Sequence, residues 1–468
     1  MPVFEHVSHY PFPRAEVFGW HTRAGAFQRL TPPGMATILA GSHEGLALGS
    51  DVLLRVSHPL IAALVPAVGF RGCRGPVGLN WLVRLVDVAP GEHFVDDQVS
   101  GPFRSWHHEH LFADGADGST AITDRVTWEL PPGLGAVRPL VESQLRALFT
   151  FREHQLRDDL TLHAAVDSAP RTVVISGASG LIGRQVRALF TTGGHQVRRL
   201  VRSAAVSSDA IRWDPSAARI PGDALAGIDV AVNLSGHSIG GRFSAANKQA
   251  ILLSRVGAAT TLARALAAQA PAATLVQASA VGVYGARRPG EILTENSSAG
   301  DGFLADVVRA WEAAAAPAAS AGLRTTFLRT GIVLTEGGGV LAPQLPLYAL
   351  FVGGRLAAAD AWLSWITLDD IARAYVHAAL TTSLEGPVNA VGPTPVTNGV
   401  FASTLGRVLG RPSLVPTPAV GPTALLGAEG YDQLVRTDQR VRPAKLTGAG
   451  FTFAQPSLEG ALRHVLRR

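Results

Sequence analysis

A strand, a glycine turn and a helix follow one another without a gap, and this succession constrains the fold more than any other feature. The apolar run 172–176 leads into a G-x-x-G-x-x-G turn, and a helical stretch continues to residue 192. In such a turn the first glycine permits the bend, the second lets the backbone approach a pyrophosphate, and the third lets the helix pack close to the sheet. The helix N-terminus then presents unpaired N–H donors to phosphates. The segment predicts a dinucleotide site, with contacts from Gly177, Ser179, Gly180, Leu181, Ile182 and Gly183.

The end of the next expected strand, residues 196–202, indicates which dinucleotide is bound. A site for NAD usually carries an acidic residue about 20 positions after the glycines, where it holds the ribose 2′-hydroxyl. Here the strand ends in Arg202 and Ser203, and no acidic residue follows before Asp209. A guanidinium suits a 2′-phosphate, so we expect NADP(H) with Arg202 and Ser203 beside that phosphate. The alternative is a solvated arginine at a strand end.

The length and composition limit the class of protein. A chain of 468 residues exceeds one ordinary core, so two domains are expected. The single cysteine, Cys73, excludes internal disulfides and multi-cysteine zinc sites. The N-terminus lacks the regions of a signal peptide and no apolar run reaches 18 residues, so we expect a cytoplasmic protein without a membrane span. The net charge is only +5 and the arginines are scattered, so no nucleic-acid partner is expected.

A small, polar stretch with a proline, residues 164–171, marks a domain boundary. The domain after it, 171–468, alternates strands and helices, which predicts an α/β fold with a doubly wound parallel sheet, the Rossmann arrangement. A smaller C-terminal module begins at about residue 415. Strands are expected at 172–176, 196–202, 228–234, 273–279 and 324–329, and helices at 181–192, 244–268 and 303–321.

The domain before the boundary, 1–165, has a different pattern. Short runs of alternating apolar and polar residues recur, and a long amphipathic stretch, 134–163, ends the domain. This pattern predicts an α+β domain in which one long helix lies in the curve of an antiparallel sheet, an arrangement that often encloses an apolar cavity. The alternating runs are 4–10, 51–56, 81–88, 93–100, 105–112 and 120–129.

Residues 171 to about 465 closely resemble the atypical epimerase-like branch of the extended short-chain dehydrogenase/reductase superfamily. The ending 430–453 also resembles the small C-terminal module of that branch. The motifs that carry the resemblance follow one another in the order of the family, and they are 176–183 (SGASGLIG), 233–236 (NLSG), 254–255 (SR), 278–285 (ASAVGVYG), 328–334 (LRTGIVL) and 364–371 (SWITLDDI).

The N-terminal domain resembles the START-like polyketide cyclase/dehydrase superfamily. The resemblance rests on a strand followed by a helix opening at 13–18 (PRAEVF), and on the segment 30–34 (LTPPG). It implies a helix-grip fold with a cavity for an apolar ligand.

The proton-transfer pair of short-chain dehydrogenases is missing. That pair is a tyrosine four residues before a lysine, where the lysine lowers the pKa of the tyrosine. The chain has five tyrosines, and none has a lysine four residues later. The helix at 303–321, where extended relatives carry the pair, offers neither residue. Ser279, at a strand end, is the remaining catalytic candidate and a further cofactor or substrate contact, whereas Tyr284 is expected to be a packed ring with a satisfied hydroxyl.

Two further segments are candidates for the cofactor site. At the end of the expected strand 228–234, Asn233, Leu234, Ser235 and Gly236 should pass beside the adenine and ribose, because small residues let the backbone approach. Asp214 lies between the expected strands 196–202 and 228–234, at a strand end where an acidic residue often meets the adenine edge, and the alternative is an aspartate in a turn.

Histidines in the segment 106–110 (WHHEH) suggest a metal site. On a strand, His108 and His110 share one face and His107 and Glu109 the other. With no third ligand in view, we favour a polar sheet surface and expect no metal.

The sequence thus predicts an NADP(H)-dependent epimerase or reductase that acts on an unidentified small molecule, with an N-terminal module that binds an apolar ligand. The missing tyrosine–lysine pair favours an alternative, a sensor or carrier that binds NADP(H) without catalysis. A third hypothesis makes the N-terminal module the active part, as a cyclase or a lipid-transfer domain. Neither the substrate nor the oligomeric state follows from the sequence.

Overall fold

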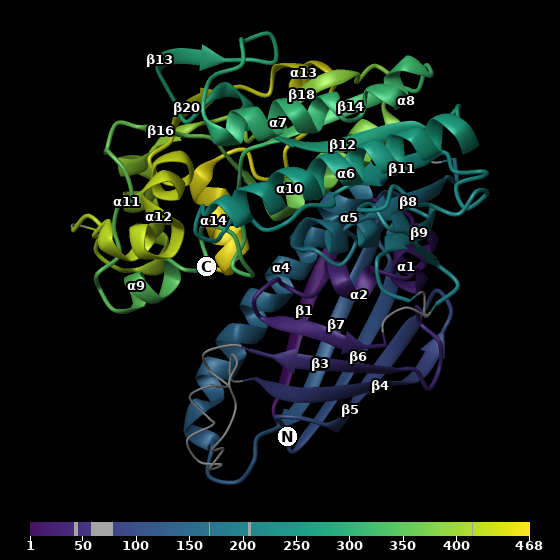
Figure 1. The fold of residues 1–468 in the computed structure, drawn as a ribbon. Helices are drawn as coiled ribbons and strands as arrows, with labels where there is room; N and C mark the ends of the chain where they lie inside the picture. Colours follow the sequence, from purple (N-terminus) through teal and green to yellow (C-terminus); the bar gives the residue numbers. More distant parts are fainter. Residues whose placement is uncertain (42–44, 58–77, 168, 205–206, 414) are drawn as a thin grey trace. The chain divides into compact units, whose positions relative to one another are not determined.

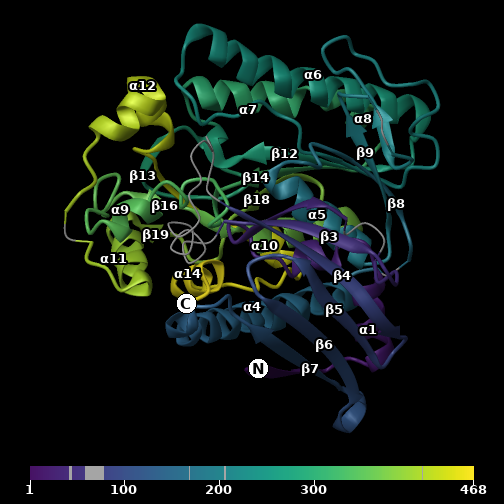
Figure 2. The same ribbon diagram turned by 90° about the horizontal axis from the view of Figure 1, so that it is seen from below.

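The chain forms two compact units, which are described separately. The computed structural model describes residues 1–41, 45–57, 78–167, 169–204, 207–413 and 415–468. One unit holds residues 1–165 and the other holds most of residues 166–468. The single cysteine, Cys73, lies outside the described residues, and so does Ser168 of the expected linker. Figures 1 and 2 show the two units in two orientations.

The N-terminal unit is built on a seven-stranded antiparallel sheet with the order β1-β7-β6-β5-β4-β3-β2. The alternation expected from the sequence is visible in β7, where every second residue is buried. The strands are β1 (Val3–Tyr10), β2 (Ala36–Ala40), β3 (Asp51–Val56), β4 (Leu79–Ala89), β5 (His93–Ser100), β6 (Ser105–Asp114) and β7 (Thr120–Glu129). The sequence predicts all of these except the short strand β2.

Among the described residues of this unit, three α-helices accompany the sheet: α1 (Arg14–Thr22), α2 (Ala26–Arg29) and the long α4 (Arg138–Ala165). Helix α4 lies along one face of the sheet (Figure 1). Its Leu145 and Phe149 pack against Trp106 and Trp128 of the sheet. A mainly apolar cavity of about 250 Å³ lies in this unit, lined by residues of the sheet, of α2 and of α4.

The C-terminal unit contains a seven-stranded parallel sheet with the order β10-β9-β8-β11-β12-β14-β18. This confirms the predicted doubly wound arrangement. The strand order changes direction between β8 and β11, and ligands of such sheets bind at the carboxyl ends of the strands at this point. The strands are β8 (Thr172–Ser176), β9 (Gln196–Val201), β10 (Ala210–Arg212), β11 (Val230–Asn233), β12 (Thr274–Ala280), β14 (Thr325–Thr330) and β18 (Gly386–Ala390).

Helices cover both faces of the parallel sheet, with α6 and α7 on one side and α5 and α10 on the other (Figure 2). Because the chain bends after Ala313, the single helix expected at 303–321 is divided into two. The helices are α5 (Leu181–Thr192), α6 (Ala245–Gln269), α7 (Phe303–Ala313), α8 (Ala316–Ser320) and α10 (Leu368–Leu380).

Smaller elements complete the C-terminal unit. They include three two-stranded sheets, which pair β13 with β20, β15 with β17 and β16 with β19. The elements are β13 (Arg287–Leu293), β15 (Ile332–Leu334), β16 (Trp362–Leu363), β17 (Trp365–Thr367), β19 (Val396–Thr397), β20 (Asp438–Val441), α9 (Leu345–Ala349), α11 (Asn398–Leu409), α12 (Val420–Leu434), α13 (Ala444–Gly448) and α14 (Leu458–Leu466).

Helix α6 is long and apolar enough to cross a membrane by length and composition alone. Its Ala258, Leu262 and Leu266 are buried in a core cluster that also contains Val174 of β8 and Leu275 of β12. A helix that covers a buried parallel sheet has this composition, so the criterion is weak evidence here. The cytoplasmic location expected from the sequence stays a prediction.

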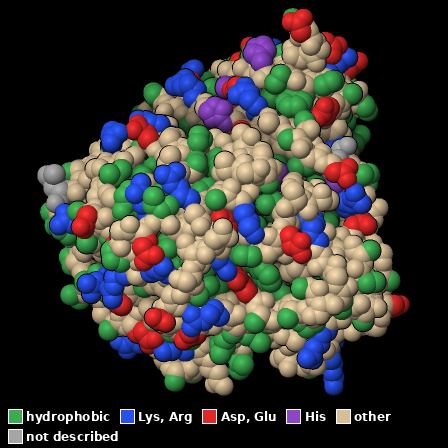
Figure 3. Space-filling view, turned by 90° about the horizontal axis from the view of Figure 1, so that it is seen from above, with side chains coloured by type: hydrophobic (Ala, Val, Ile, Leu, Met, Phe, Trp, Pro, Cys, Tyr) green, Lys and Arg blue, Asp and Glu red, His purple; other side chains and the backbone are tan. Residues whose placement is uncertain are grey.

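Charges are mixed on the face of the molecule drawn in Figure 3, where basic side chains alternate with acidic ones and no continuous basic area forms. This agrees with the scattered arginines of the sequence. That nucleic acid is not a partner stays a prediction.

An ion pair with no exposed surface ties α2 to α4 in the N-terminal unit. The guanidinium of Arg29 donates two hydrogen bonds to the carboxylate of Asp159, at 2.8 and 2.7 Å, and both side chains are 0% exposed. Gln155 donates a further hydrogen bond to the same carboxylate. The attraction between the two charges and their hydrogen bonds offsets the desolvation penalty of burying a carboxylate and a guanidinium.

Removing the charge of this carboxylate tests how much the pair stabilises the unit. We expect Asp159→Asn to lower the free energy of unfolding by about 3–5 kcal/mol, because the guanidinium of Arg29 would lose its counter-charge inside the protein. Urea unfolding followed by tryptophan fluorescence measures the change. Asp117→Asn, a matched loss of charge at an exposed turn, should leave stability nearly unaltered. Equal effects of the two substitutions would contradict a structural role for the pair.

Candidate functional site

The turn between β8 and α5 leaves one of its three glycines open and packs the other two tightly. Gly177 has a φ of +69°, and a Cβ built on it would lie 2.7 Å from the carbonyl oxygen of Leu234. A Cβ on Gly183 would collide with the carbonyl oxygen of Gly177. On Gly180 it would meet only one atom within 4 Å, the carbonyl oxygen of Gly177 at 3.2 Å. The surface at Gly180 is therefore free for a ligand, as the sequence predicts for the second glycine.

The start of α5 lies at this open surface. Ser179 and Gly180 are exposed, and Leu181 and Ile182 begin the helix. The first N–H groups of a helix have no partner within the helix, so they are available to an anion. The backbone of this turn can therefore bind a pyrophosphate.

Two arginines near the end of β9 differ in their partners. The guanidinium of Arg199 donates to both carboxylate oxygens of Asp209, at 2.7 and 2.8 Å, and to Ser207. Arg202 is exposed, and within the described part of the chain its side chain forms no hydrogen bond or ion pair. Of the two arginines, Arg202 is therefore the one available to a 2′-phosphate. The exposed Ser203 lies next to it in the sequence.

The side chain of Asn233 connects three strands and is fully buried. Its Oδ1 accepts hydrogen bonds from the Ser176 hydroxyl at 2.5 Å and the Ser235 backbone N–H at 3.3 Å. Its Nδ2 donates to Gln277 at 2.8 Å. The side chain thus joins the ends of β8, β11 and β12. The expected passage of residues 233–236 beside the adenine and ribose stays a prediction.

Asp214 forms a turn, the alternative left open by the sequence. Its Oδ1 accepts hydrogen bonds from the backbone N–H groups of Ser216 and Ala217 and from the Ser216 hydroxyl. The Ser216 hydrogen bond contributes most to lowering the pKa of this exposed carboxylate. A contact with an adenine edge stays a prediction.

A half-buried cation that the sequence analysis did not identify as a site residue lies beside Gly236. A Cβ on Gly236 would come within 3.2 Å of the Arg255 guanidinium. This guanidinium donates to the carbonyl oxygens of His237 and Ile251 and lies 5.1 Å from the ring centre of Trp311. Among the residues that the structure describes, no carboxylate lies within ion-pair distance, and burial lowers the pKa of Arg255 to about 10. Arg255 is thus a partly desolvated cation suited to an anionic ligand.

Ser279, the catalytic candidate, belongs to a chain of hydrogen bonds at the ends of β12, β14 and β18. It is only 3% exposed, and its hydroxyl donates to Oε1 of Glu312 at 2.6 Å. The guanidinium of Arg329 donates to both carboxylate oxygens of Glu312 at 2.9 Å. Burial lowers the pKa of Arg329, but the hydrogen bonds and charge of Glu312 outweigh it and raise the pKa overall.

Tyr284 belongs to the same series of hydrogen bonds and is fully buried. Its hydroxyl accepts a hydrogen bond from Arg329 at 3.1 Å and donates one to Oδ1 of Asn389 at 2.8 Å. Burial raises the pKa of Tyr284, so the hydroxyl keeps its proton at neutral pH. The expectation that Tyr284 is a packed ring with a satisfied hydroxyl is confirmed.

The helix that carries the tyrosine–lysine pair in extended relatives corresponds to α7, which here has the sequence FLADVVRAWEA. Instead of a tyrosine and a lysine, this helix supplies Glu312 to Ser279 and Arg329. Sequence reasoning missed Glu312, Arg329 and Arg255 as members of the site. The sequence did place Arg255 and Arg329 within motifs that resemble the family, 254–255 and 328–334. Neither motif shows which side chain each arginine contacts.

The hydroxyl of Tyr284 offers a test of the packing interpretation. We expect Tyr284→Phe to lower the free energy of unfolding by about 1–3 kcal/mol, because Arg329 and Asn389 would each lose a buried partner. The affinity for NADPH should not change, because the ring is fully buried. Thermal unfolding and a fluorescence titration with NADPH measure the two quantities. A large loss of affinity or activity without a loss of stability would instead assign the hydroxyl to the reaction.

The C-terminal part of the chain is similar to proteins of a known family. Residues 173–389 match the model of the NAD dependent epimerase/dehydratase family. Residues 417–465 and 62–160 match two domains of unknown function, DUF1731 and DUF8410. An epimerase family protein of Mycobacterium bovis is 39% identical over 301 residues, which cover 64% of this chain and 99% of that protein.

Two solved structures extend the comparison. A nucleoside-diphosphate sugar epimerase from Corynebacterium glutamicum is 34% identical and has a TM-score of 0.78, with coverage of 100% of this chain and 90% of that one. A human epimerase family protein solved with NADPH is 29% identical and has a TM-score of 0.57, with coverage of 63% of this chain and 98% of that one. These likenesses confirm the resemblance seen in the C-terminal motifs, and the chain belongs, through this part, to the NAD-dependent epimerase/dehydratase family.

Proposed function

We propose that the C-terminal unit binds NADP(H) across the 177–183 turn and uses it to oxidise, reduce or epimerise a hydroxyl or carbonyl centre of a small molecule. The observation that carries the proposal is the open surface at Gly180, flanked by two tightly packed glycines and by the first turn of α5. A pyrophosphate fits there against backbone N–H groups, with the positive end of the helix dipole behind it.

The preference for NADP(H) follows from the two arginines at the end of β9. Arg199 is neutralised by Asp209, whereas Arg202 is exposed at the strand end. A human relative was solved with NADPH, which supports the same choice of cofactor for this chain. The adenosine 2′-phosphate would lie against Arg202 and Ser203.

The chemistry at the substrate would depend on Ser279 and Glu312. The bound cofactor supplies or accepts a hydride. Because the Ser279 hydroxyl donates to Glu312, its lone pairs can accept a hydrogen bond from a substrate hydroxyl. Arg255, a cation with no carboxylate at ion-pair distance among the described residues, suits an anionic group on the substrate or cofactor. The Corynebacterium relative is described as a nucleoside-diphosphate sugar epimerase, and a nucleoside diphosphate sugar has such anionic groups.

A second candidate function is binding of NADP(H) without turnover, as in a sensor or carrier. Three observations favour it: no Tyr-x-x-x-Lys sequence occurs, Tyr284 is fully buried, and Ser279 is 3% exposed. The cofactor contacts at the glycine turn and at Arg202 do not depend on these residues.

For the N-terminal unit we propose a START-like helix-grip module that binds an apolar ligand. The order of its elements supports the proposal, because the described residues form one strand, two short α-helices, six further strands and a long C-terminal helix. The cavity of about 250 Å³ has a wall that includes Leu30, Val56, Leu85 and Phe149, which suits an apolar molecule.

Valine substitutions at Gly180 and at Gly183 should have different effects on cofactor binding and on folding. Gly180→Val should abolish NADPH binding with little change in melting temperature, because the added side chain would occupy the ligand surface. Gly183→Val should destabilise the unit, because its Cβ would collide with the backbone at Gly177. NADPH titration and thermal unfolding distinguish the two effects. Undiminished NADPH binding by a folded Gly180→Val variant would mean that the cofactor binds elsewhere.

The choice between the two dinucleotides depends on Arg202. The unaltered protein should bind NADPH more tightly than NADH, and Arg202→Ala should reduce the ratio of affinities about ten-fold or more, because a hydrogen bond to a charged group contributes about 1.5–3 kcal/mol. Isothermal titration with both cofactors measures the ratio. Arg264→Ala, at an exposed position on α6, serves as the control and should leave the ratio unchanged. Equal affinities in the unaltered protein would refute the assignment.

Turnover decides between the two candidate functions. General acid–base assistance contributes about 10²–10⁴-fold to a rate, so an enzyme without the tyrosine–lysine pair should oxidise NADPH slowly with carbonyl substrates. Ser279→Ala should lower that slow rate further and leave the cofactor affinity unaltered. Stopped-flow absorbance of NADPH in the presence of carbonyl compounds and nucleotide sugars measures the rate. No turnover with any of these compounds, together with tight NADPH binding, would favour the sensor or carrier.

A further inference from the structure

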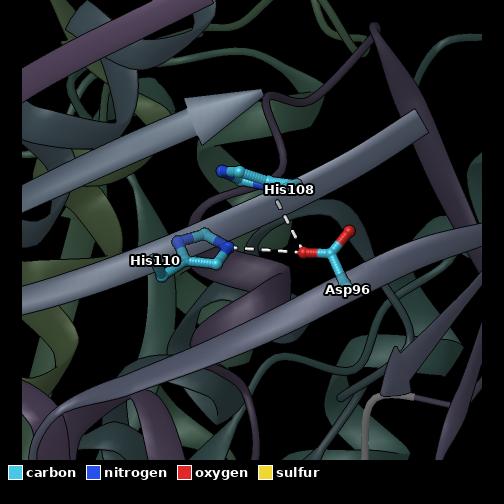
Figure 4. Close-up of side chains that lie close together, drawn as sticks. All are labelled: Asp96, His108 and His110. Carbon is cyan, nitrogen blue, oxygen red and sulfur yellow. Dashed lines mark hydrogen bonds and ion pairs between the residues drawn. The ribbon is translucent and has the colours of Figure 1, made fainter. Parts of the chain in front are cut away.

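Three side chains of types that bind metals lie together on the wall of the N-terminal cavity. Asp96 stands on β5, directly opposite His108 of β6, and His110 follows on the same face of β6. His108 and His110 are 3% and 8% exposed, so the expectation of a polar sheet surface was wrong for this face of the strand. Figure 4 shows both imidazoles in contact with the same carboxylate oxygen of Asp96.

Two distances within the cluster match the separation of ligands around one ion. Oδ2 of Asp96 lies 3.3 Å from Nδ1 of His108 and 3.3 Å from Nε2 of His110. A charge-assisted N–H···O hydrogen bond is shorter, about 2.7–2.9 Å. Ligand bonds of about 2.0–2.1 Å in a tetrahedral zinc site place two ligand atoms about 3.3 Å apart. One ligand atom from each of the three residues lies within 4.8 Å of the others.

A fourth residue orients both imidazoles. Oδ1 of Asp124, on the neighbouring strand β7, lies 3.2 Å from Nε2 of His108 and 2.6 Å from Nδ1 of His110. When these two nitrogens donate to Asp124, the other nitrogen of each ring is left with its lone pair towards Asp96. Carboxylates behind metal-binding histidines act in this way, because they fix the tautomer and the ring orientation.

We propose that Asp96, His108 and His110 bind one divalent transition-metal ion, with Asp124 as the positioning residue behind the two histidines. Two imidazoles and one carboxylate are a donor set for Zn²⁺ or Fe²⁺. All three ligands line the cavity, so the remaining coordination positions face its interior. The site is separate from the dinucleotide turn and does not depend on the proposed reaction of the C-terminal unit.

The surroundings favour a preformed site. The ring of Phe94 stacks on His110 with 4.0 Å between centroids, and Phe149 meets His108 edge-on at 5.4 Å. These contacts restrict the rotation of both imidazoles. Asp96 and Asp124 supply two negative charges beside the two imidazoles, and the guanidinium of Arg152 on α4 is close enough to interact with both carboxylates.

The competing interpretation is a ring of ion pairs without a metal. Burial alone would lower the pKa of His108, but Asp96 and Asp124 outweigh it and raise the pKa overall. In this interpretation a protonated His108 pairs with Asp96 and Asp124, and no metal ion is bound. Protons and the metal would compete for the same nitrogens, so metal affinity should fall with decreasing pH.

Cobalt binding to the full-length, untagged chain after treatment with a chelator distinguishes the two interpretations. We expect one Co²⁺ per chain, seen by its visible d–d absorption and displaced by Zn²⁺. His110→Gln and Asp96→Asn should abolish this absorption, and Asp124→Asn should weaken binding about 10- to 100-fold. His107→Gln is the matched control, because His107 stands on the same strand with its side chain on the other face, and it should bind like the unaltered chain.

Circular dichroism verifies that each variant is folded. If His110→Gln does not fold, the nearly isosteric Asp96→Asn carries the comparison, and the stoichiometry for the unaltered chain is an independent measurement. Absence of stoichiometric cobalt binding by the unaltered chain would overturn the proposal in favour of the ion-pair ring. Binding that survives in folded Asp96→Asn, or that is lost equally in His107→Gln, would place the ion elsewhere and overturn it as well.

Discussion

The close packing of the 177–183 turn against the end of β11 is the constraint on which the C-terminal unit depends. Gly177 lies so near the Leu234 carbonyl that any side chain would collide, and Gly183 is held against the carbonyl of Gly177. The buried side chain of Asn233 completes this arrangement by joining the ends of three neighbouring strands. The two crowded glycines maintain the crevice, whereas the uncrowded Gly180 leaves it accessible to a ligand.

In each unit, a cluster of buried polar side chains lies at a candidate ligand site, and the members of the cluster form hydrogen bonds or ion pairs with one another. In the C-terminal unit, Glu312 accepts hydrogen bonds from Ser279 and Arg329, so the hydroxyl of the catalytic candidate is held by a carboxylate that also forms an ion pair. In the N-terminal unit, His108 and His110 lie between two carboxylates on the wall of an apolar cavity. Unpaired polar groups are costly in such surroundings, so both clusters limit which ligands can enter.

Local patterns predicted most elements but few of the contacts between them. Alternation and helical periodicity identified six of the seven N-terminal strands and the strands and helices around the glycine turn, because each is specified by its own residues. Strand β2 was missed since it has five residues and no buried position. Asp96 was not recognised as a third ligand, because the register that places it opposite His108 is a property of two paired strands. Likewise, only the structure shows that Arg199 is neutralised and Arg202 is exposed.

The central claim is that the C-terminal unit is an NADP(H) site. Mass spectrometry of the small molecules released by denaturing the freshly purified, full-length protein tests this claim most directly, because the cofactor is identified without a choice of substrate. The account predicts release of NADP⁺ or NADPH from the unaltered chain and its loss from the Gly180→Val variant. Release of NAD⁺ or NADH in place of the phosphorylated form would contradict the assignment of Arg202, and equal release from both chains would contradict the location of the site.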